Sequence, residues 1–440
     1  MSVRLPETLT MGHGAARRPS LGIIGSGIAG LGVAYQLRHE FEITVFERDT
    51  QLGGHIRPVR ILDSDGISHE IDTGFLFYQP AYYPEICRLF DELGVPNGGL
   101  AAEPALAIWD PQQNLLSKPS EFFQFSKGAP AGEVTADLRR LTRLFATLNH
   151  NPTLLHGSPL TAGQYFEEQG YHPRTVECFI VPILAVIWGF QDHQVRAMSV
   201  GSLFGELRRL TSAPWRVKPT SRQYLDALVG SLESVRLLPG RSVGTIEQVD
   251  DRVKIVCEGE IFDFDYVVVA AHADCALKLL GDRDRHRFAP LEALHYNHGI
   301  GIVHSDRRVL PPVGTDSPFT LTWLARTPTP HWLVTWDLDD DGERGGAQRL
   351  LISFGDATLL EEGSIDEARI YRVLPSGHPS LTPQFVSAQT ILDQLNHGPR
   401  LFLSGSYFGH LGNHEDAYRS ALVVSERIRR SHLNRAAWRP

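Results

Sequence analysis

The chain has 440 residues, of which 42% are hydrophobic and 21% are charged, and its formal net charge is -9 at pH 7. This composition is typical of a soluble globular protein, and the length predicts about two to three subdomains instead of one core. A mildly acidic chain lacks the concentrated basic face of a nucleic-acid-binding protein, so we expect no nucleic-acid partner.

The N-terminal elements are predicted to form a βαβ unit. Residues 1–19 are mostly polar or small and lack the apolar segment of a signal peptide, so we expect a loose tail there. An apolar run at 21–25 predicts a buried strand, helical spacing predicts a helix at 28–39, and EITVFE predicts a second strand at 42–47. This order of strand, glycine turn, helix and strand is typical of a βαβ unit.

A block of helices is predicted in the middle of the chain. Helical periodicity occurs at 82–94, 134–149, 161–169, 174–188, 199–210 and 222–233. The most apolar stretch, FIVPILAVIWGF at 179–190, contains Pro182 and is too short to span a bilayer. We therefore expect a core or pocket-lining helix there and no transmembrane segment.

Strands dominate the C-terminal half. Patterns at 241–249, 252–257, 260–264 and 265–271 predict a β-meander that ends in a buried strand. Further strands are predicted at 299–304, 319–325, 332–337, 350–354 and 400–405, before a last helix at 414–430. We expect a discontinuous nucleotide-binding domain (20–95, 235–285 and 398–431), a substrate domain with the helical block (96–234 and 286–397) and a C-terminal tail (432–440).

The four cysteines are scattered at positions 87, 178, 257 and 275, without CxxC or Cys/His metal spacing. This usage predicts reduced thiols, a cytoplasmic protein and no metal site.

The first glycine turn carries the clearest signal for a bound nucleotide. Gly25, Gly27 and Gly30 form GxGxxG, in which the first permits a tight turn, the second admits a pyrophosphate and the third lets helix and strand pack closely. The helix that follows presents free N–H groups and a positive dipole end to phosphates. Glu47, at the end of the next strand, is placed to bind ribose hydroxyls. Both NAD and FAD fit this turn.

Sequence beyond the turn resembles the flavin amine oxidase superfamily. The pair Gly53-Gly54 in RDTQLGGHIR (48–57) is similar to its extended FAD fingerprint, and the resemblance continues through EIDTGFLFYQPAYYPEICRLFDELGV (70–95) and GPRLFLSGSYFGHLGNHEDAYRSALVVSERI (398–428). Within the superfamily the chain is most similar to a bacterial group described as predicted NAD/FAD-binding, amine-oxidase-like proteins. Domains of this group are also fused to plant cyclopropane fatty acid synthases. The segments AAHADCALKLL (270–280), SGHPSLTPQFVSAQ (376–389) and GNHEDAYRSAL (412–422) carry this similarity.

The resemblance implies an α/β fold: a Rossmann-like FAD-binding domain with a β-meander, and an inserted α+β substrate domain, as in amine oxidases and glutathione reductase. The last helix would point its N-terminus at the flavin pyrimidine ring and stabilise negative charge there, which favours FAD over NAD. The cofactor-binding residues so implied are Gly25, Ser26, Gly27, Ile28, Ala29, Gly30, Glu47, Arg48, Gly53, Gly54, His55, Ile56, Gly74, Phe75, Val243, Gly405, Ser406, His414 and Glu415.

Non-covalent FAD is expected because the superfamily attaches flavin through a cysteine just before the last helix, and all four cysteines lie upstream of residue 280. His55 stays open as a linkage. It stands where many amine oxidases have an arginine, and a hydrogen-bonded loop histidine explains it equally well.

Catalytic residues are not identified by the sequence. Many amine oxidases of the superfamily carry a lysine on the strand that corresponds to 298–306, and this chain has none there. The weak candidates are His414, Tyr407, Trp188 and Lys218. Each has a structural alternative: a helix cap for His414, core packing for the two aromatic residues and a solvated side chain for Lys218.

These features predict an FAD-dependent oxidoreductase that dehydrogenates a small or lipophilic substrate by hydride transfer to flavin N5, through C–N oxidation or C–C desaturation. Two alternatives stay open: an FAD-dependent isomerase or mutase without net redox, and a non-catalytic flavoprotein partner of a lipid-modifying enzyme. The expected partner is a small-molecule or lipid-like substrate, and a homodimer is compatible with the sequence.

Overall fold

A computed structural model describes the chain from residue 17 to residue 436. Its description leaves out 57, 63–65, 76, 97–100, 103–105, 111–114, 119–123, 128–131, 152, 183, 185–188, 213–214, 218–220, 281–285, 311–318, 325–330, 338–349, 358–359 and 361–362.

A parallel five-stranded sheet forms the first layer. Its strands, in spatial order, are β11 (Arg236–Pro239), β2 (Glu42–Glu47), β1 (Ser20–Ile24), β15 (Tyr266–Val269) and β21 (Leu401–Leu403). Burial on both faces explains why β1 and β15 read as continuous apolar runs. Segments from three distant parts of the sequence therefore meet in one sheet.

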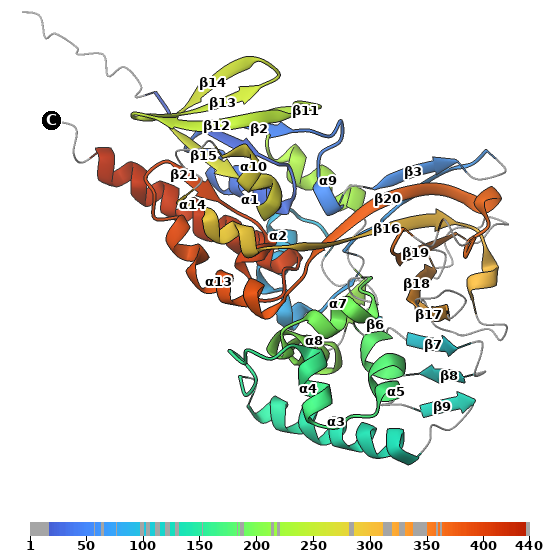
Figure 1. The fold of residues 1–440 in the computed structure, drawn as a ribbon. Helices are drawn as coiled ribbons and strands as arrows, with labels where there is room; N and C mark the ends of the chain where they lie inside the picture. The colour runs from blue at the N-terminus through green and yellow to red at the C-terminus, as the bar shows by residue number, and fades with distance from the viewer. Residues whose placement is uncertain are drawn as a thin grey trace, which may run out of the picture.

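Two helices from opposite ends of the chain pack together beside this sheet. They are α1 (Ile28–Leu37) and α14 (His414–Ala436) (Figure 1). A Cβ at Gly32 would come within 2.9 Å of the Tyr418 ring, so the glycine permits this close approach. The meander β12 (Val243–Val249), β13 (Arg252–Cys257) and β14 (Glu260–Phe264) packs on the sheet, with Ile255 and Phe264 against Gly22.

The second layer is an eight-stranded sheet, with a helical block near one end (Figure 1). The order of its strands is β20 (Ile370–Pro379), β16 (Tyr296–His304), β19 (Leu351–Gly355), β18 (His331–Asp337), β17 (Phe319–Leu324), β7 (Leu106–Asp110), β8 (Leu115–Lys118) and β9 (Gln124–Lys127). The helical block contains α3 (Gly132–His150), α4 (Ala162–Glu168), α5 (Pro173–Thr175), a π-helical turn (Val176–Ile180), α7 (Asp192–Ala197) and α8 (Val200–Ser212).

Smaller elements connect these layers. The hairpin β3 (Val59–Leu62) and β4 (Ser68–Ile71) and the sheet of β5 (Phe77–Tyr78), β10 (Trp215–Val217) and β6 (Ala101–Ala102) are short. The remaining helices are α2 (Pro84–Glu92), α9 (Ser221–Gly230), α10 (Ala273–Leu279) and α13 (Pro383–Leu395). Short 3-10 turns lie at Gly54–Ile56, Pro80–Tyr82, Ala289–Ala293, Arg307–Val309, Glu367–Arg369 and Ser406–Phe408.

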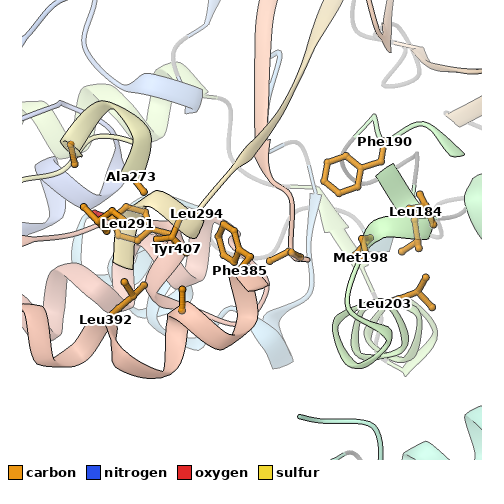
Figure 2. Close-up of a cluster of buried hydrophobic side chains, with 14 of the residues drawn as sticks. Leu184, Phe190, Met198, Leu203, Ala273, Leu291, Leu294, Phe385, Leu392 and Tyr407 are labelled. Atoms are coloured by element: carbon orange, nitrogen blue, oxygen red, sulfur yellow. The ribbon is translucent and has the colours of Figure 1, made fainter. Parts of the chain in front are cut away.

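Strands β16 and β20 join the two layers. They pair antiparallel from Tyr296 opposite Pro379 to His304 opposite Ile370, and they run together from the eight-stranded sheet towards the parallel sheet (Figure 1). One hydrophobic cluster spans both regions. Figure 2 shows Leu291, Phe385 and Leu392 gathered in one part of it and Leu184, Met198 and Leu203 in another.

The expected domain boundaries at 235 and 398 remain a prediction. Helices α9 and α13 lie just before these boundaries, in the ranges expected for the substrate domain, yet they contact the nucleotide-binding ranges. Residues Tyr224 and Leu228 of α9 are buried in the same cluster as residues of α1. The amide of Asn396, just after α13, exchanges hydrogen bonds with the backbone of Leu403 in β21. Both helices therefore pack with the parallel sheet.

Within the described ranges, none of the helices has the length and apolar character needed to cross a membrane.

Candidate cofactor and substrate site

The glycine turn between β1 and α1 is shaped by protein contacts on two sides and is open on the third. Gly25 has φ of 101°, and a Cβ there would come 2.5 Å from the Ala270 carbonyl oxygen. A Cβ at Gly30 would overlap the Gly25 carbonyl oxygen. By contrast, a Cβ at Gly27 would meet no protein atom within 4 Å. The free space at Gly27, at the N-terminus of α1, fits a phosphate group.

Glu47 holds this turn against the end of β2. Its Oε2 accepts hydrogen bonds from the Ser26 backbone N–H (2.9 Å) and hydroxyl (2.7 Å), and its Oε1 accepts one from the Asp49 N–H (3.0 Å). A carboxylate offers about four acceptor positions, so Glu47 can still bind a ribose hydroxyl. The Arg241 N–H donates to the Glu47 carbonyl at 2.7 Å, which places the loop that leads to Val243 beside this acid. The Arg48 side chain is 72% exposed.

The second glycine pair lies directly on the first turn. The Gly53 N–H donates to the Ser26 carbonyl oxygen at 3.1 Å, and a Cβ at Gly54 would lie 3.1 Å from the Gly27 Cα. The chain then passes Gly74, where a Cβ would come 2.7 Å from the His55 carbonyl oxygen. Ile56 is buried. The segments 25–30, 53–56 and 74–75 therefore form one continuous surface.

This surface extends to the start of α14. The Phe75 ring stacks on the His414 ring, with centroids 4.1 Å apart and an interplanar angle of 19°. His414 Nε2 also lies 3.3 Å from the Tyr224 hydroxyl. The N-terminus of α14 is thus connected to the glycine turns through Phe75, although His414 follows Gly54 by 360 residues in the sequence.

Glu415 has a structural partner of its own. Its two carboxylate oxygens accept the Glu85 and Ile86 backbone N–H groups, at 3.1 and 3.0 Å, at the start of α2. Burial raises the pKa of Glu415 in spite of these bonds. The Glu415 carboxylate therefore caps α2. A cofactor at the first turn of α14 would be contacted by the backbone of Glu415 instead of its side chain.

The other candidates of this segment are placed as follows. Gly405 N–H donates to the Ser420 hydroxyl at 2.9 Å, and Ser406 begins a 3-10 turn. Tyr407 is buried, burial raises the pKa of its hydroxyl, and that hydroxyl has no hydrogen-bond partner among the described residues. Trp188 and Lys218 lie outside the described residues.

Three histidine rings from distant segments meet next to the second glycine pair. The His55 ring lies 5.9 Å from His378, nearly parallel to it, and 6.0 Å from His272. His272 in turn stacks on Tyr296 at 4.4 Å. Burial, and then the neighbouring histidines, lower the pKa of His272 to about 4 and that of His378 to about 3. Both imidazoles are therefore neutral near pH 7.

Sequence reasoning missed His272 and His378. Both stand in segments that carry the resemblance to the bacterial group, AAHADCALKLL and SGHPSLTPQFVSAQ, and that was the available signal. Their proximity to His55 depends on pairing between β16 and β20, which the sequence does not reveal.

A small cavity of about 10 Å³, the room of about one water molecule, lies beside the histidines, at β16. It is lined by Gly189, Phe190, Gln194, Asn297, His298, Gly299, Ile300, Phe354, Gly355 and Ser376. Asn297 stands opposite His378 in the β16–β20 register, and the Phe190 ring lies 6.4 Å from His378. Histidines thus separate this cavity from the glycine turns. Within the described residues, no group of three or more histidine, cysteine or acidic side chains is placed to hold a metal ion.

Comparison with known proteins supports a dinucleotide-binding domain in the first part of the chain. The family model of NAD(P)-binding Rossmann-like domains matches residues 23–93. Among curated proteins, no sequence matches the chain significantly.

Several solved structures match nearly the whole chain. The CLA-producing fatty acid isomerase from P. acnes is 14% identical, with a TM-score of 0.65 over 93% of this chain and 98% of that chain. Cyclohexylamine oxidase from Brevibacterium oxydans IH-35A is 13% identical, with a TM-score of 0.64 over 94% and 100%. A reduced UDP-galactopyranose mutase is 14% identical, with a TM-score of 0.62 over 96% of both chains. The chain shares their fold, and the expected mixed α/β class with a Rossmann-like domain is confirmed.

Proposed function

We propose that this chain is an FAD-dependent oxidoreductase of the flavin amine oxidase superfamily that dehydrogenates a small or lipophilic substrate. The observation that carries the proposal is the continuous surface from Gly27 through Gly54 and Phe75 to His414. A compact nucleotide needs the first turn alone, whereas an extended dinucleotide uses a surface that reaches a second helix N-terminus.

The residues fit FAD in the following roles. The open side of Gly27 and the N–H groups that begin α1 bind the pyrophosphate, and Glu47 binds ribose hydroxyls. The N-terminus of α14 offers a positive dipole end to the flavin. When bound, FAD supplies an acceptor for a hydride from a substrate C–H bond. The neutral imidazoles of His272 and His378 lie beside His55, next to the second glycine pair. We propose non-covalent binding, because all four cysteines precede residue 280.

C–C desaturation is favoured over amine oxidation within this proposal. The stretch 298–306, where many amine oxidases carry a lysine, has none in this chain. An isomerase or mutase without net redox is the second candidate, since two structures of the same fold are named as a fatty acid isomerase and a UDP-galactopyranose mutase. We further propose that the chain belongs to the bacterial amine-oxidase-like group and that the protein is cytoplasmic.

The test begins with the colour of the purified protein. We expect flavin absorbance bands, and release of the flavin into the supernatant when the protein is denatured. Under anaerobic conditions the protein is then mixed with fatty acids, their amides and aliphatic amines. A dehydrogenase bleaches its flavin with one of these classes and yields a product lighter by two hydrogens. An unchanged product mass selects the isomerase. A protein that stays colourless after incubation with FAD contradicts the proposal. A protein that binds FAD, but whose flavin is not reduced by any of the compounds and which converts none of them, is a non-catalytic flavoprotein.

A further inference from the structure

A buried ion pair of the helical block contacts the segment that follows Phe75. Glu206 and Arg209 stand three residues apart on α8, and both side chains are shielded from solvent. Arg209 Nη2 donates to Glu206 Oε2 at 2.7 Å, and Arg209 Nε donates to both carboxylate oxygens at 3.2 Å. Apolar side chains of similar size often stabilise a core as well as a buried ion pair does, so such a pair points to a demand for geometry instead of stability.

Gln79 joins this pair to the chain that leads into α2. Its side chain is fully buried, its Oε1 accepts a hydrogen bond from Arg209 Nη1 at 3.2 Å, and its Nε2 donates to the Arg209 carbonyl oxygen at 2.9 Å. The amide oxygen thus faces a donor and the amide nitrogen an acceptor, as their chemistry requires. The Gln79 backbone carbonyl accepts the N–H groups of Tyr82 and Tyr83, at 2.8 and 3.1 Å. One residue therefore ties α8 to the turn before α2.

Phe75 has a backbone conformation that its surroundings must hold. Its φ is 52°, in the left-handed region that a bulky side chain rarely adopts. Strain of this kind persists where the surrounding structure over-determines it, and it clusters at ligand sites. The Phe75 ring lies 5.7 Å from the Tyr83 ring and 4.1 Å from the His414 ring. Arg209 in turn places its guanidinium carbon 5.9 Å from the centroid of the Tyr83 ring.

These contacts form one connected path from the helical block to the proposed cofactor surface. In order, its members are Glu206, Arg209, Gln79, Tyr83, Phe75 and His414.

We infer that Glu206 and Arg209 are positioning residues of the proposed cofactor site: they hold Phe75 in its left-handed conformation against His414, so that the helical block sets the affinity for the dinucleotide. Both residues act through Gln79 and Tyr83. This inference rests on the proposed function, because it assigns positioning residues to the same site.

The test replaces both charged residues at once, because removal of one alone leaves an unpaired buried charge that threatens folding. Glu206→Leu/Arg209→Met removes the ion pair and the guanidinium contact with Gln79. A second variant, Gln79→Met, cuts the path at the next residue and leaves the ion pair in place. The matched control is Asp192→Asn/Arg196→Met, which removes an ion pair of 2.7 Å within α7 of the same helical block.

The first measurement is hydrogen exchange of the cofactor-free protein, read by mass spectrometry on peptides that contain Tyr82 and Tyr83. Their N–H groups donate to the Gln79 carbonyl, so their exchange reports release of this turn. The second measurement is the dissociation constant of FAD, from fluorescence quenching. In the paired variant and in Gln79→Met we expect about 10-fold faster exchange and about 10-fold weaker binding, as the loss of one hydrogen bond to a charged group implies. The control should change neither.

A glycine at position 75 separates positioning from general stability. Glycine adopts a positive φ without steric cost, so no strained conformation is left for the ion pair to hold. Added to Phe75→Gly, the paired replacement should weaken FAD binding by less than about 2-fold, because coupled residues are not additive. A purely structural ion pair would give the same loss of affinity with and without Phe75→Gly.

Two results would overturn the inference: unchanged exchange or unchanged FAD affinity in both the paired variant and Gln79→Met, or an equal loss of affinity with and without Phe75→Gly. Circular dichroism and thermal melting of the cofactor-free proteins check folding, and Gln79→Met carries the test if the paired variant is unfolded. A parent protein that binds no FAD overturns the proposed function together with this inference. A parent that binds FAD, with variants that bind it equally well, overturns this inference alone.

Discussion

At Gly27 the proposed cofactor requires a glycine, whereas the fold by itself does not. Its backbone has φ of -66° and ψ of 176°, which any residue can adopt, and its Cβ position is free of protein atoms. Gly25 and Gly30, in contrast, are required by contacts within the protein itself. The fold therefore leaves room for a Cβ at position 27, which would lie in the space proposed for the pyrophosphate.

We predict that Gly27→Val yields a folded, colourless protein. A Cβ at position 27 meets no protein atom within 4 Å, so the midpoint of thermal unfolding of the cofactor-free protein should stay close to that of the parent. Binding of FAD, followed by fluorescence quenching, should be lost. Gly205→Ala in α8, where a Cβ also meets nothing within 4 Å, is the matched control and should remain yellow. A yellow Gly27→Val protein would refute the proposed position of the pyrophosphate.

At the scale of elements, α14 does more than present its N-terminus. Glu415 in its first turn satisfies two free N–H groups at the start of α2, and Asp416 accepts the Leu411 N–H at 3.1 Å in the loop before the helix. Free N–H groups at a helix start need such acceptors. The helix thus fixes the orientation of α2 and of the chain segment that follows Phe75.

We predict that Glu415→Gln lowers the free energy of unfolding by about 1–2 kcal/mol, because an amide offers one acceptor oxygen where the carboxylate offers two. The measurement is denaturant unfolding at saturating FAD. Glu426→Gln, on the exposed side of the same helix and paired with Arg430, should cost less than about 1 kcal/mol. Equal stabilities of the two variants would show that the contact with α2 contributes nothing.

Elements differ in how well the sequence predicted them. The amphipathic helix expected at 134–149 is observed as α3, and the strand expected at 42–47 is β2. Strand β20 is not among the predicted strands, and it contains Pro375, Gly377 and Pro379, residue types that are depleted in strands. It lies at the edge of its sheet, where a missing N–H is tolerated, and pairing with β16 forms it. Such pairing has no local signature.

At the scale of the whole molecule, buried neutral histidines couple stability to pH. His304 is fully buried, its Nδ1 accepts the Asp306 N–H, and its Nε2 lies 2.8 Å from the Ser353 hydroxyl. Burial lowers the pKa of His304 to about 4, against the opposing effect of Asp306. Between about pH 4 and about pH 6.5 the unfolded chain therefore binds a proton that the folded chain does not, and stability rises with pH.

We predict that the protein loses stability as the pH falls from about 6.5 towards 4, and that His304→Asn reduces this dependence by up to about 1.4 kcal/mol per pH unit. The measurement is the free energy of unfolding at several pH values. His397→Asn, at a side chain that is 66% exposed, should leave the slope unchanged. Carboxyl groups with raised pKa values, such as Glu415, act in the opposite sense, so the difference between variants is the decisive quantity. Identical slopes for all three proteins would contradict the assignment.

The sequence by itself determined the local features of this protein. The glycine turn, with the strand and helix around it, the meander and the last helix depend on residues that are close together in the sequence. Glycine spacing and apolar periodicity reflect these local contacts directly. The tertiary structure decided which distant segments share a surface. The stack of Phe75 on His414, the meeting of His55 with His272 and His378 and the capping of α2 by Glu415 all arise from packing between segments far apart in the chain. These contacts depend on strand register and helix packing, which form when the whole core is buried and leave no periodic pattern in the sequence.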